Sequence, residues 1–231
     1  MNKKRILFAL TFPAGAKDLP SLDFFPLLEY NNTRKSRHQG EPGKMERKTY
    51  KMKIAGLDRE LPLCPLNEKL QIGAFVIFGD PELTTACAAE LLRRAPEYDY
   101  AITAEAKGIP LVHEMARLDG NRKYFLARKA AKLYMTDVFE FRVRSITTAR
   151  EQVLYLDRAD AEQMKGKRIL IVDDVVSTGE SLHAIEELVR AAGGIICGRM
   201  TILAEGDAAS RDDLVYLEKL PLFDSEGNPI G

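Results

Sequence analysis

A run of apolar residues that leads directly into two aspartates and a turn of small residues lies in the last third of the chain. Residues 168–181 read RILIVDDVVSTGES. The apolar run predicts a buried strand that places Asp173 and Asp174 at the edge of a sheet, and Gly179 lets the backbone come close to a ligand where the next helix starts. Free N–H groups and the positive end of the dipole at a helix start favour an anion such as phosphate. We therefore expect an α/β fold with a phosphate site at the carboxyl end of a strand.

Strand-length apolar runs alternate with helix-length amphipathic stretches from about residue 72 onward. We expect strands at 72–78, 100–103, 124–127, 168–172 and 195–203, and helices at 81–94, 110–118 and 180–192. Asp80 is the expected cap of the first helix, with Pro81 at its first position, and Gly193 is the expected left-handed end of the last. This order implies right-handed crossovers and a parallel sheet with helices on both faces.

The N-terminal part of the chain differs in composition from the rest. We divide the chain into an arm and hood over residues 1–70, partly irregular, and a core over residues 71–231. Residues 31–53 hold most of the basic excess of the first part and contain several turn formers, so they predict a solvated loop or mobile arm. The alternative for this segment is a contact with an anionic ligand or partner.

The overall composition is that of a globular protein, with 45% hydrophobic residues and 34 basic side chains balanced by 34 acidic ones. Proteins that bind nucleic acid by neutralising phosphates usually have a basic surplus, so we expect no nucleic-acid partner. The three cysteines show no C-x-x-C spacing and are expected to be buried thiols in a reducing compartment.

Membrane and secretory signals are also weak in this sequence. The apolar run after the basic residues 3–5 is interrupted by Thr11, Pro13 and Gly15, unlike a secretory signal. No other window approaches the roughly 18 apolar residues that a membrane span requires. We therefore expect a soluble, cytoplasmic protein with no membrane partner.

Three other interpretations of residues 168–181 can be weighed from the sequence. A strand with an acidic pair is typical of a Walker B segment, but no G-x-x-x-x-G-K-[ST] phosphate loop occurs in the chain. The string ILIVDD also opens response-regulator receiver domains, but too few residues follow it to build one. A purely structural capped strand leaves two neighbouring carboxylates unexplained. The three histidines show neither metal-ligand spacing nor a Ser-His-Asp order.

Three motifs together resemble those of the type I phosphoribosyltransferases, over about residues 70–225. RILIVDDVVSTGES is similar to the loop of that family that binds 5-phosphoribosyl 1-pyrophosphate (PRPP). AEAKG, residues 104–108, resembles the pyrophosphate loop, and LARKAAKLYM, residues 126–135, resembles the basic stretch of the adenine and xanthine branch. The resemblance implies the type I parallel-sheet core, a small N-terminal hood, a mobile active-site loop and a homodimer.

The resemblance also implies a set of PRPP-binding residues: Glu105, Ala106, Lys107, Gly108, Arg128, Lys129, Lys132, Asp173, Asp174, Val175, Val176, Ser177, Thr178, Gly179, Glu180 and Ser181. It implies that Asp173 and Asp174 hold the ribose diol and are the catalytic candidates, and that a non-prolyl cis peptide lies near residues 105–107. It implies Mg²⁺ as the cofactor, carried by PRPP near Asp173, with no direct protein ligand.

The motifs define the base that accepts the phosphoribosyl group less well than they define the donor, PRPP. The hypoxanthine-guanine branch has a carboxylate at the position of Ser177, and a serine cannot replace it as an acid or base at neutral pH. Adenine enzymes have a Tyr-Glu pair in the mobile loop, at about residues 142–157 here, where Glu151 is a weaker candidate for the glutamate. The resemblance therefore implies purine salvage by transfer of 5-phosphoribosyl to a purine, with adenine favoured and xanthine next.

A regulatory protein is the alternative. AKGIPL, residues 106–111, is also similar to the purine-operon repressors of Gram-positive bacteria, whose phosphoribosyltransferase-like domain is a sensor. Those proteins carry an N-terminal winged helix, and the six prolines in residues 1–70 would interrupt most of its helices. A catalytically silent protein that senses PRPP or purines remains the second interpretation.

Overall fold

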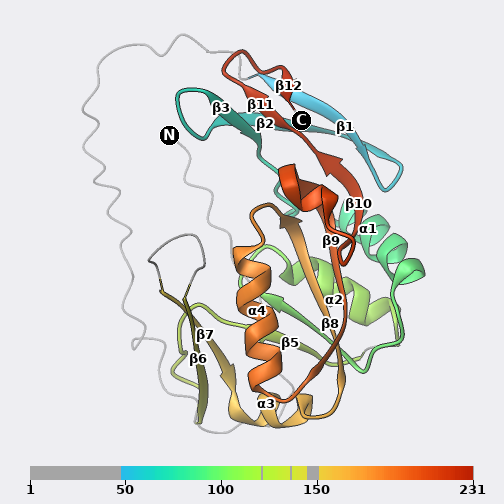
Figure 1. The fold of residues 1–231 in the computed structure, drawn as a ribbon. Coiled ribbons are helices and arrows are strands. Elements are labelled where there is room, and N and C mark those ends of the chain that lie inside the picture. The colour runs from blue at the N-terminus through green and yellow to red at the C-terminus, as the bar shows by residue number, and fades with distance from the viewer. Residues whose placement is uncertain (1–47, 121, 136, 145–150, 231) are drawn as a thin grey trace, which may run out of the picture. The chain divides into compact units, whose positions relative to one another are not determined.

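The computed structural model describes residues 48–120, 122–135, 137–144 and 151–230. These residues belong to one compact unit that contains a parallel sheet, an antiparallel sheet and a two-stranded hairpin (Figure 1). The core is the parallel sheet, with strands in the order β10 (Val215–Leu220), β9 (Ile195–Glu205), β8 (Arg168–Val176), β4 (Tyr100–Ala104) and β5 (Tyr124–Ala127). Each neighbouring pair in this sheet is parallel, as the alternation of strands and helices predicted.

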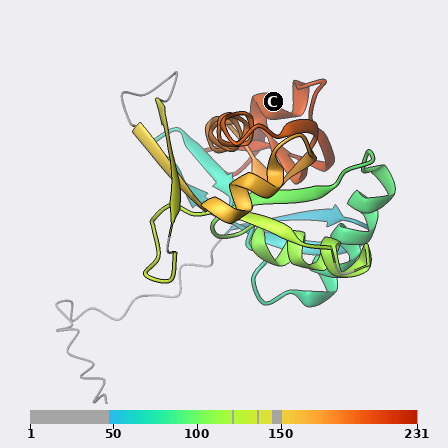
Figure 2. The same cartoon turned by 90° about the horizontal axis from the view of Figure 1, so that it is seen from below.

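Helices cover both faces of this sheet (Figure 2). Alternate residues of β8 point to opposite faces, because successive side chains of a strand alternate. Leu170 and Val172 belong to the apolar cluster formed with α1 (Pro81–Arg94) and α2 (Ile109–Leu118). Ile169 and Ile171 belong to the cluster formed with α3 (Arg158–Met164) and α4 (Glu180–Ala191). The continuous apolar run of β8 therefore reflects a strand that is buried on both faces.

The expected ends of the helices are confirmed. Asp80 caps α1 by accepting a 3.0 Å hydrogen bond from the N–H of Leu83, and Pro81 is the first residue of the helix. Gly193, with a φ of 77°, provides the left-handed residue after α4. The expected strand over 72–78 is wrong, because β3 (Leu70–Gly73) ends earlier and belongs to the other sheet. The residues after Gly73 lead into α1, and a turn from Ile77 to Asp80 closes this segment.

The antiparallel sheet joins residues from both ends of the described chain. Its strands follow the order β1 (Thr49–Ile54), β2 (Leu57–Pro65), β3, β11 (Leu222–Asp224) and β12 (Pro229–Ile230). The expected loop over residues 31–53 is therefore wrong for its last five residues, and residues 31–47 lie outside the described part. In β1, Lys51 and Lys53 pair across the hairpin with Glu60 and Asp58, and the residues between them are more buried. The lysines thus mark the solvent side of a half-buried strand.

A second hairpin follows the parallel strand β5. It pairs β6 (Val138–Arg144) with β7 (Glu151–Asp157) over seven residue pairs. Backbone hydrogen bonds of 2.9 Å in both directions between Arg128 and Tyr155 join this hairpin to the segment after β5. Residues 145–150 lie outside the described residues, so the mobile loop in this region stays a prediction. The division of the chain at residues 70 and 71, which falls at the start of β3, also stays a prediction.

Candidate active site

The carboxyl ends of β4 and β8 lie side by side and bring two of the predicted loops together. The residues after β4 form the loop to α2, and the peptide between Glu105 and Ala106 is cis, as expected for this neighbourhood. The ammonium of Lys107 lies 3.1 Å from Oδ2 of Asp174 on β8. Residues more than sixty positions apart in the sequence thus form one site.

Gly108 makes the close contact between these two loops possible. A methyl group added at Gly108 would lie 2.1 Å from Oγ1 of Thr103 and 3.1 Å from Oδ1 of Asp173. The first distance is far inside a normal van der Waals contact. Sequence analysis did not single out Thr103, which is the fully buried fourth residue of β4. No motif marks it, because its role depends on a contact with the loop that follows.

The two aspartates differ in their surroundings. Asp173 is half-buried, and its Oδ1 accepts a 2.9 Å hydrogen bond from the N–H of Asp174. Burial, followed by the negative charge of Asp174, raises the pKa of Asp173, and the positive charge of Lys107 opposes this shift. Asp174 is 3% exposed. Its Oδ2 accepts no well-aligned hydrogen bond from the described residues despite the nearby ammonium. The pair therefore has spare acceptor capacity for ligand hydroxyls or a cation.

The turn after β8 is open to an anion. Ser177 and Thr178 are exposed, and Gly179 has a φ of 77°, which suits a residue without a side chain. Gly179 is the N-cap residue directly before α4, and within the described part of the chain no side chain caps this helix. The nearest approach is weak, since Thr178 Oγ1 lies 3.5 Å from the N–H of Glu180. First-turn N–H groups and the helix dipole are thus available to a phosphate.

The basic stretch after β5 gathers around Glu105. Arg128 Nη1 and Lys132 Nζ lie 3.1 and 3.3 Å from Oε1 of Glu105. Burial raises the pKa of this carboxyl, but hydrogen bonds from Lys132 and from the backbone of Lys129 lower it overall. The side chain of Lys129 is exposed. Glu105 thus holds two cations beside the pyrophosphate loop, a role that the motif alone did not indicate.

The remaining predicted residues occupy different positions. Val175 and Val176 complete β8 and pack on opposite faces of the sheet, while Ser181 is exposed on the first turn of α4. Glu151 begins β7, but its side chain lies outside the described residues. Across the described residues, no group of three or more His, Cys, Asp or Glu side chains could hold a metal ion. In the same part of the chain, no helix is both long and apolar enough to cross a membrane.

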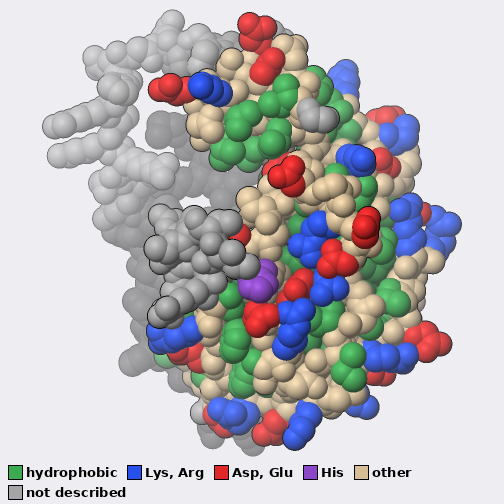
Figure 3. Space-filling model, viewed as in Figure 1, with side chains coloured by type: hydrophobic (Ala, Val, Ile, Leu, Met, Phe, Trp, Pro, Cys, Tyr) green, Lys and Arg blue, Asp and Glu red, His purple; other side chains and the backbone are tan. Residues whose placement is uncertain are grey.

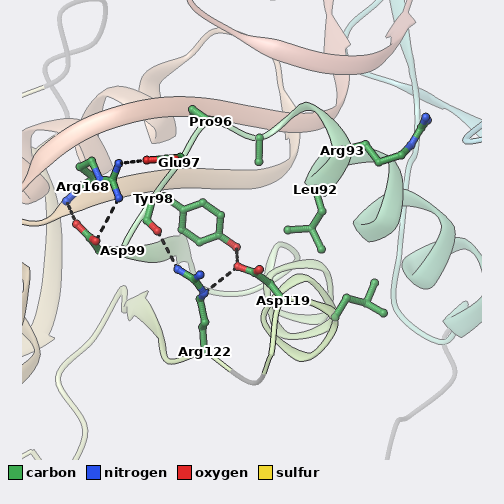
Figure 4. Close-up of a pocket in the computed structure, with 11 residues that line it drawn as sticks. Leu92, Arg93, Pro96, Glu97, Tyr98, Asp99, Asp119, Arg122 and Arg168 are labelled. Carbon is green, nitrogen blue, oxygen red and sulfur yellow. Dashed lines mark hydrogen bonds and ion pairs between the residues drawn. The ribbon is translucent and has the colours of Figure 1, made fainter.

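A hollow of about 680 Å³ lies at the opposite edge of the sheet, beside the starts of β4 and β8 (Figure 4). Most of its charged side chains are paired with one another, and Arg93 is paired with Glu90 outside the lining. Arg168 lies 2.8 Å from Glu97 and 3.5 Å from Asp99, and Arg122 lies 3.0 Å from Asp119. Ligands of parallel sheets bind at the carboxyl ends of the strands, so this hollow is separate from the candidate active site.

Residues 93–219, more than half of the chain, match the family model described as the phosphoribosyl transferase domain. The chain belongs to the phosphoribosyltransferase family. The match includes the pyrophosphate loop, the basic stretch and the aspartate pair with its turn. It also removes the ATPase and receiver-domain interpretations of residues 168–181.

Several curated phosphoribosyltransferases are similar to this one in sequence. An adenine phosphoribosyltransferase from Petrotoga mobilis is 33% identical over 131 residues, which cover 56% of this chain and 71% of the relative. A xanthine phosphoribosyltransferase from Exiguobacterium sp. is 28% identical over 153 residues, 64% of this chain and 78% of the relative. An orotate phosphoribosyltransferase from Caldanaerobacter subterraneus is 32% identical over 133 residues, 57% of this chain and only 58% of the relative.

Solved phosphoribosyltransferase structures share the fold. The adenine phosphoribosyltransferase from Thermoanaerobacter pseudethanolicus superimposes with a TM-score of 0.56 at 19% identity and covers 69% of this chain and 95% of its own. This likeness confirms the expected type I core. The antiparallel sheet beside that core was not among the features expected from the sequence. The relatives named above differ in their acceptor bases, so the sequence similarity does not choose among them.

Proposed function

We propose that this phosphoribosyltransferase transfers the 5-phosphoribosyl group of PRPP to a ring nitrogen of a purine and releases pyrophosphate. The observation that carries the proposal is the contact of the pyrophosphate loop with the aspartate pair, next to an uncapped helix start. A ligand that places a diol at the aspartates, a phosphate at the turn and a diphosphate at the loop has the chemistry of PRPP.

Each part of the site has a separate role in this proposal. Asp173 and Asp174 accept hydrogen bonds from the ribose hydroxyls, and residues 177–181 bind the 5-phosphate. The backbone of residues 106–108 and the side chain of Arg128 bind the diphosphate. The bond from C1 of the ribose to the pyrophosphate oxygen breaks, and the pyrophosphate keeps the electron pair. A bond from the purine nitrogen to C1 forms, and the proton of that nitrogen passes to solvent water. Catalysis then comes mainly from positioning and charge stabilisation.

The aspartate pair is also suited to the magnesium ion that accompanies PRPP in this family. Mg²⁺ prefers oxygen ligands and keeps several waters, and Asp174 Oδ2 is a buried carboxylate oxygen that, in the described part of the chain, has the ammonium of Lys107 at 3.1 Å but accepts no well-aligned hydrogen bond. When bound, Mg²⁺ neutralises charge on the diphosphate. The residues that would hold it through PRPP are Asp173 and Asp174.

We propose adenine as the acceptor, with xanthine next. Ser177 supports this choice, because a carboxylate at this position is expected for the hypoxanthine-guanine branch. The relatives include adenine and xanthine enzymes but also hypoxanthine/guanine and orotate enzymes, so the choice of base rests on Ser177. A homodimer in the cytoplasm remains part of the proposal.

A pyrophosphate-release assay tests the function. The purified protein is mixed with PRPP and Mg²⁺ and separately with adenine, xanthine, hypoxanthine, guanine or orotate. We expect release with adenine in the wild type and none in the Asp173→Asn/Asp174→Asn variant, which should also fail to bind PRPP in a calorimetric titration. Tight PRPP binding by the wild type without turnover on any base would instead favour the silent sensor.

A further inference from the structure

Arg211 reaches the phosphate turn from a distant part of the chain. It follows η2 (Gly206–Ser210), the short 3-10 helix after the carboxyl end of β9, and precedes β10. A methyl group added at Gly179 would lie 3.2 Å from Nη1 of Arg211. The guanidinium therefore lies against the turn that starts α4, on the same edge of the sheet as the aspartate pair.

Asp213 fixes the orientation of this guanidinium. Its two carboxylate oxygens accept hydrogen bonds of 2.9 Å each from Nε and Nη2 of Arg211. Such a two-bond pair is planar and defines the direction of the third nitrogen. Hydrogen bonding to Asp213 raises the pKa of Arg211, so the side chain stays charged at all relevant pH values.

A buried glutamate on α4 anchors this pair to the helix. Glu186 is 7% exposed and lies 3.8 Å from Nη2 of Arg211. It also accepts a 2.6 Å hydrogen bond from Nε of Arg199 on β9, and this nitrogen lies 3.4 Å from Asp213. On the face seen in Figure 3, charged side chains of both signs gather over α4 and β9. The network connects Arg211 to the same helix whose start faces the expected phosphate.

One nitrogen of Arg211 remains available to a ligand. Within the described ranges, Nη1 takes part in no hydrogen bond or ion pair, and the side chain is 34% exposed. The start of α4 supplies backbone N–H groups and a partial positive charge, but a phosphate at neutral pH carries more negative charge than these balance. A guanidinium with free N–H donors beside the turn supplies the missing charge and direction.

We propose that Arg211 binds the 5-phosphate of the phosphoribosyl donor through Nη1 and makes the site selective for phosphorylated ribose. Asp213 and Glu186 are positioning residues that hold the guanidinium in place. This inference rests on the proposed function, because it assumes that the turn at residues 177–181 receives the 5-phosphate. It adds a side chain that lies outside all three motifs of the family resemblance.

The test separates the two ends of the donor by titrating each alone. Ribose 5-phosphate probes the turn, and pyrophosphate with Mg²⁺ probes the loop at residues 106–108. We expect Arg211→Gln to weaken ribose 5-phosphate and PRPP about ten- to a hundredfold, as for loss of a charge-assisted hydrogen bond, and to leave pyrophosphate binding unchanged. Arg211→Lys keeps the positive charge but lacks the planar guanidinium with its several N–H donors, so we expect a smaller loss of affinity for ribose 5-phosphate and PRPP. Arg117→Gln, an exposed arginine on α2 paired with one glutamate, is the matched control.

The outcomes distinguish the inference from the function on which it rests. If the wild type binds PRPP and Arg211→Gln binds ribose 5-phosphate equally well, the role of Arg211 is wrong and the proposed function stands. Loss of pyrophosphate binding in both Arg211 variants would show a general structural defect and would also overturn the role. If the wild type binds neither PRPP nor pyrophosphate, the proposed function itself fails. In turnover, Arg211→Gln should raise the KM for PRPP more than it lowers kcat, since binding to the remote phosphate is lost.

Discussion

The contact between Gly108 and Thr103 allows a direct test of how the pyrophosphate loop is held. Gly108 has a φ of −69° and a ψ of −12°, which any residue can adopt, so Gly108→Ala adds no backbone strain. The new methyl group would lie 2.1 Å from Oγ1 of Thr103, a fully buried residue of β4. Overpacking of this kind costs about 1–3 kcal/mol of stability and displaces the loop.

Removal of Oγ1 of Thr103 should reduce the loss of stability that Gly108→Ala causes. In the Thr103→Ala background the nearest remaining threonine atom is Cβ, 3.3 Å from the new methyl group, and Oδ1 of Asp173 lies at 3.1 Å. Thr103→Ala alone also removes a buried hydroxyl with no hydrogen-bond partner in the described part of the chain, so we expect it to change stability by less than about 1 kcal/mol. The two substitutions should therefore show a favourable coupling of about 1–2 kcal/mol.

Urea unfolding of the wild type, both single variants and the double variant measures this coupling. Thr103→Ser is the matched control, because serine keeps Oγ1 and removes only the methyl group, so it should give little relief. The KM for PRPP should rise in Gly108→Ala and recover in part with Thr103→Ala. An equal cost of Gly108→Ala in the wild-type, alanine and serine backgrounds would refute the contact as the reason for glycine at this position.

Two further predictions concern carboxylates with shifted pKa values. Burial and the charge of Asp174 raise the pKa of Asp173 in the folded protein. The contribution of Asp173 to the free energy of unfolding is therefore fully present below the pKa of about 3.9 that it has in the unfolded chain, and it is lost as the pH rises through the higher pKa of the folded state. Asp173→Asn should therefore raise the Tm at pH 8 but hardly at pH 4, and an equal Tm change at both would contradict the shift. The hydrogen bonds from Arg59, at 2.6 and 3.1 Å, lower the pKa of Asp80, so its contribution is present above pH 4 and lost as the pH falls through the lowered value. Asp80→Ala should lower the free energy of unfolding in urea by about 1–2 kcal/mol at pH 7, because both the cap of α1 and the ion pair are lost. The cost should be smaller at pH 3, and a cost independent of pH would argue against the ion pair.

The parallel core was predictable because its signals are local. The start of α1 follows from Asp80 and Pro81, and the limits of β5 and α4 match the apolar runs and periodicity closely. Each of these features depends on residues within about one helical turn or one strand of each other. The cis peptide after Glu105 followed from family resemblance and not from any physical signal in the five residues of the loop.

The antiparallel sheet was not predictable in the same way. Its strand β3 pairs with β11, which lies about 150 residues further along the chain, and β1 contains two lysines that make it similar to a solvated loop. Short strands of this kind are stabilised by cross-strand partners, so their own composition is a weak signal.

The sequence by itself determined the strand, the aspartate pair and the turn from residue 168 to 181. A buried apolar run, two carboxylates and a glycine at a helix start can all be recognised within one stretch of fourteen residues. Only the tertiary structure decided which other residues meet them. Thr103 is placed by the pairing of β4 with β8, and Arg211 by the course of the chain after β9. Contacts between residues far apart in sequence leave no periodic pattern, and these two were therefore visible only once the chain was folded.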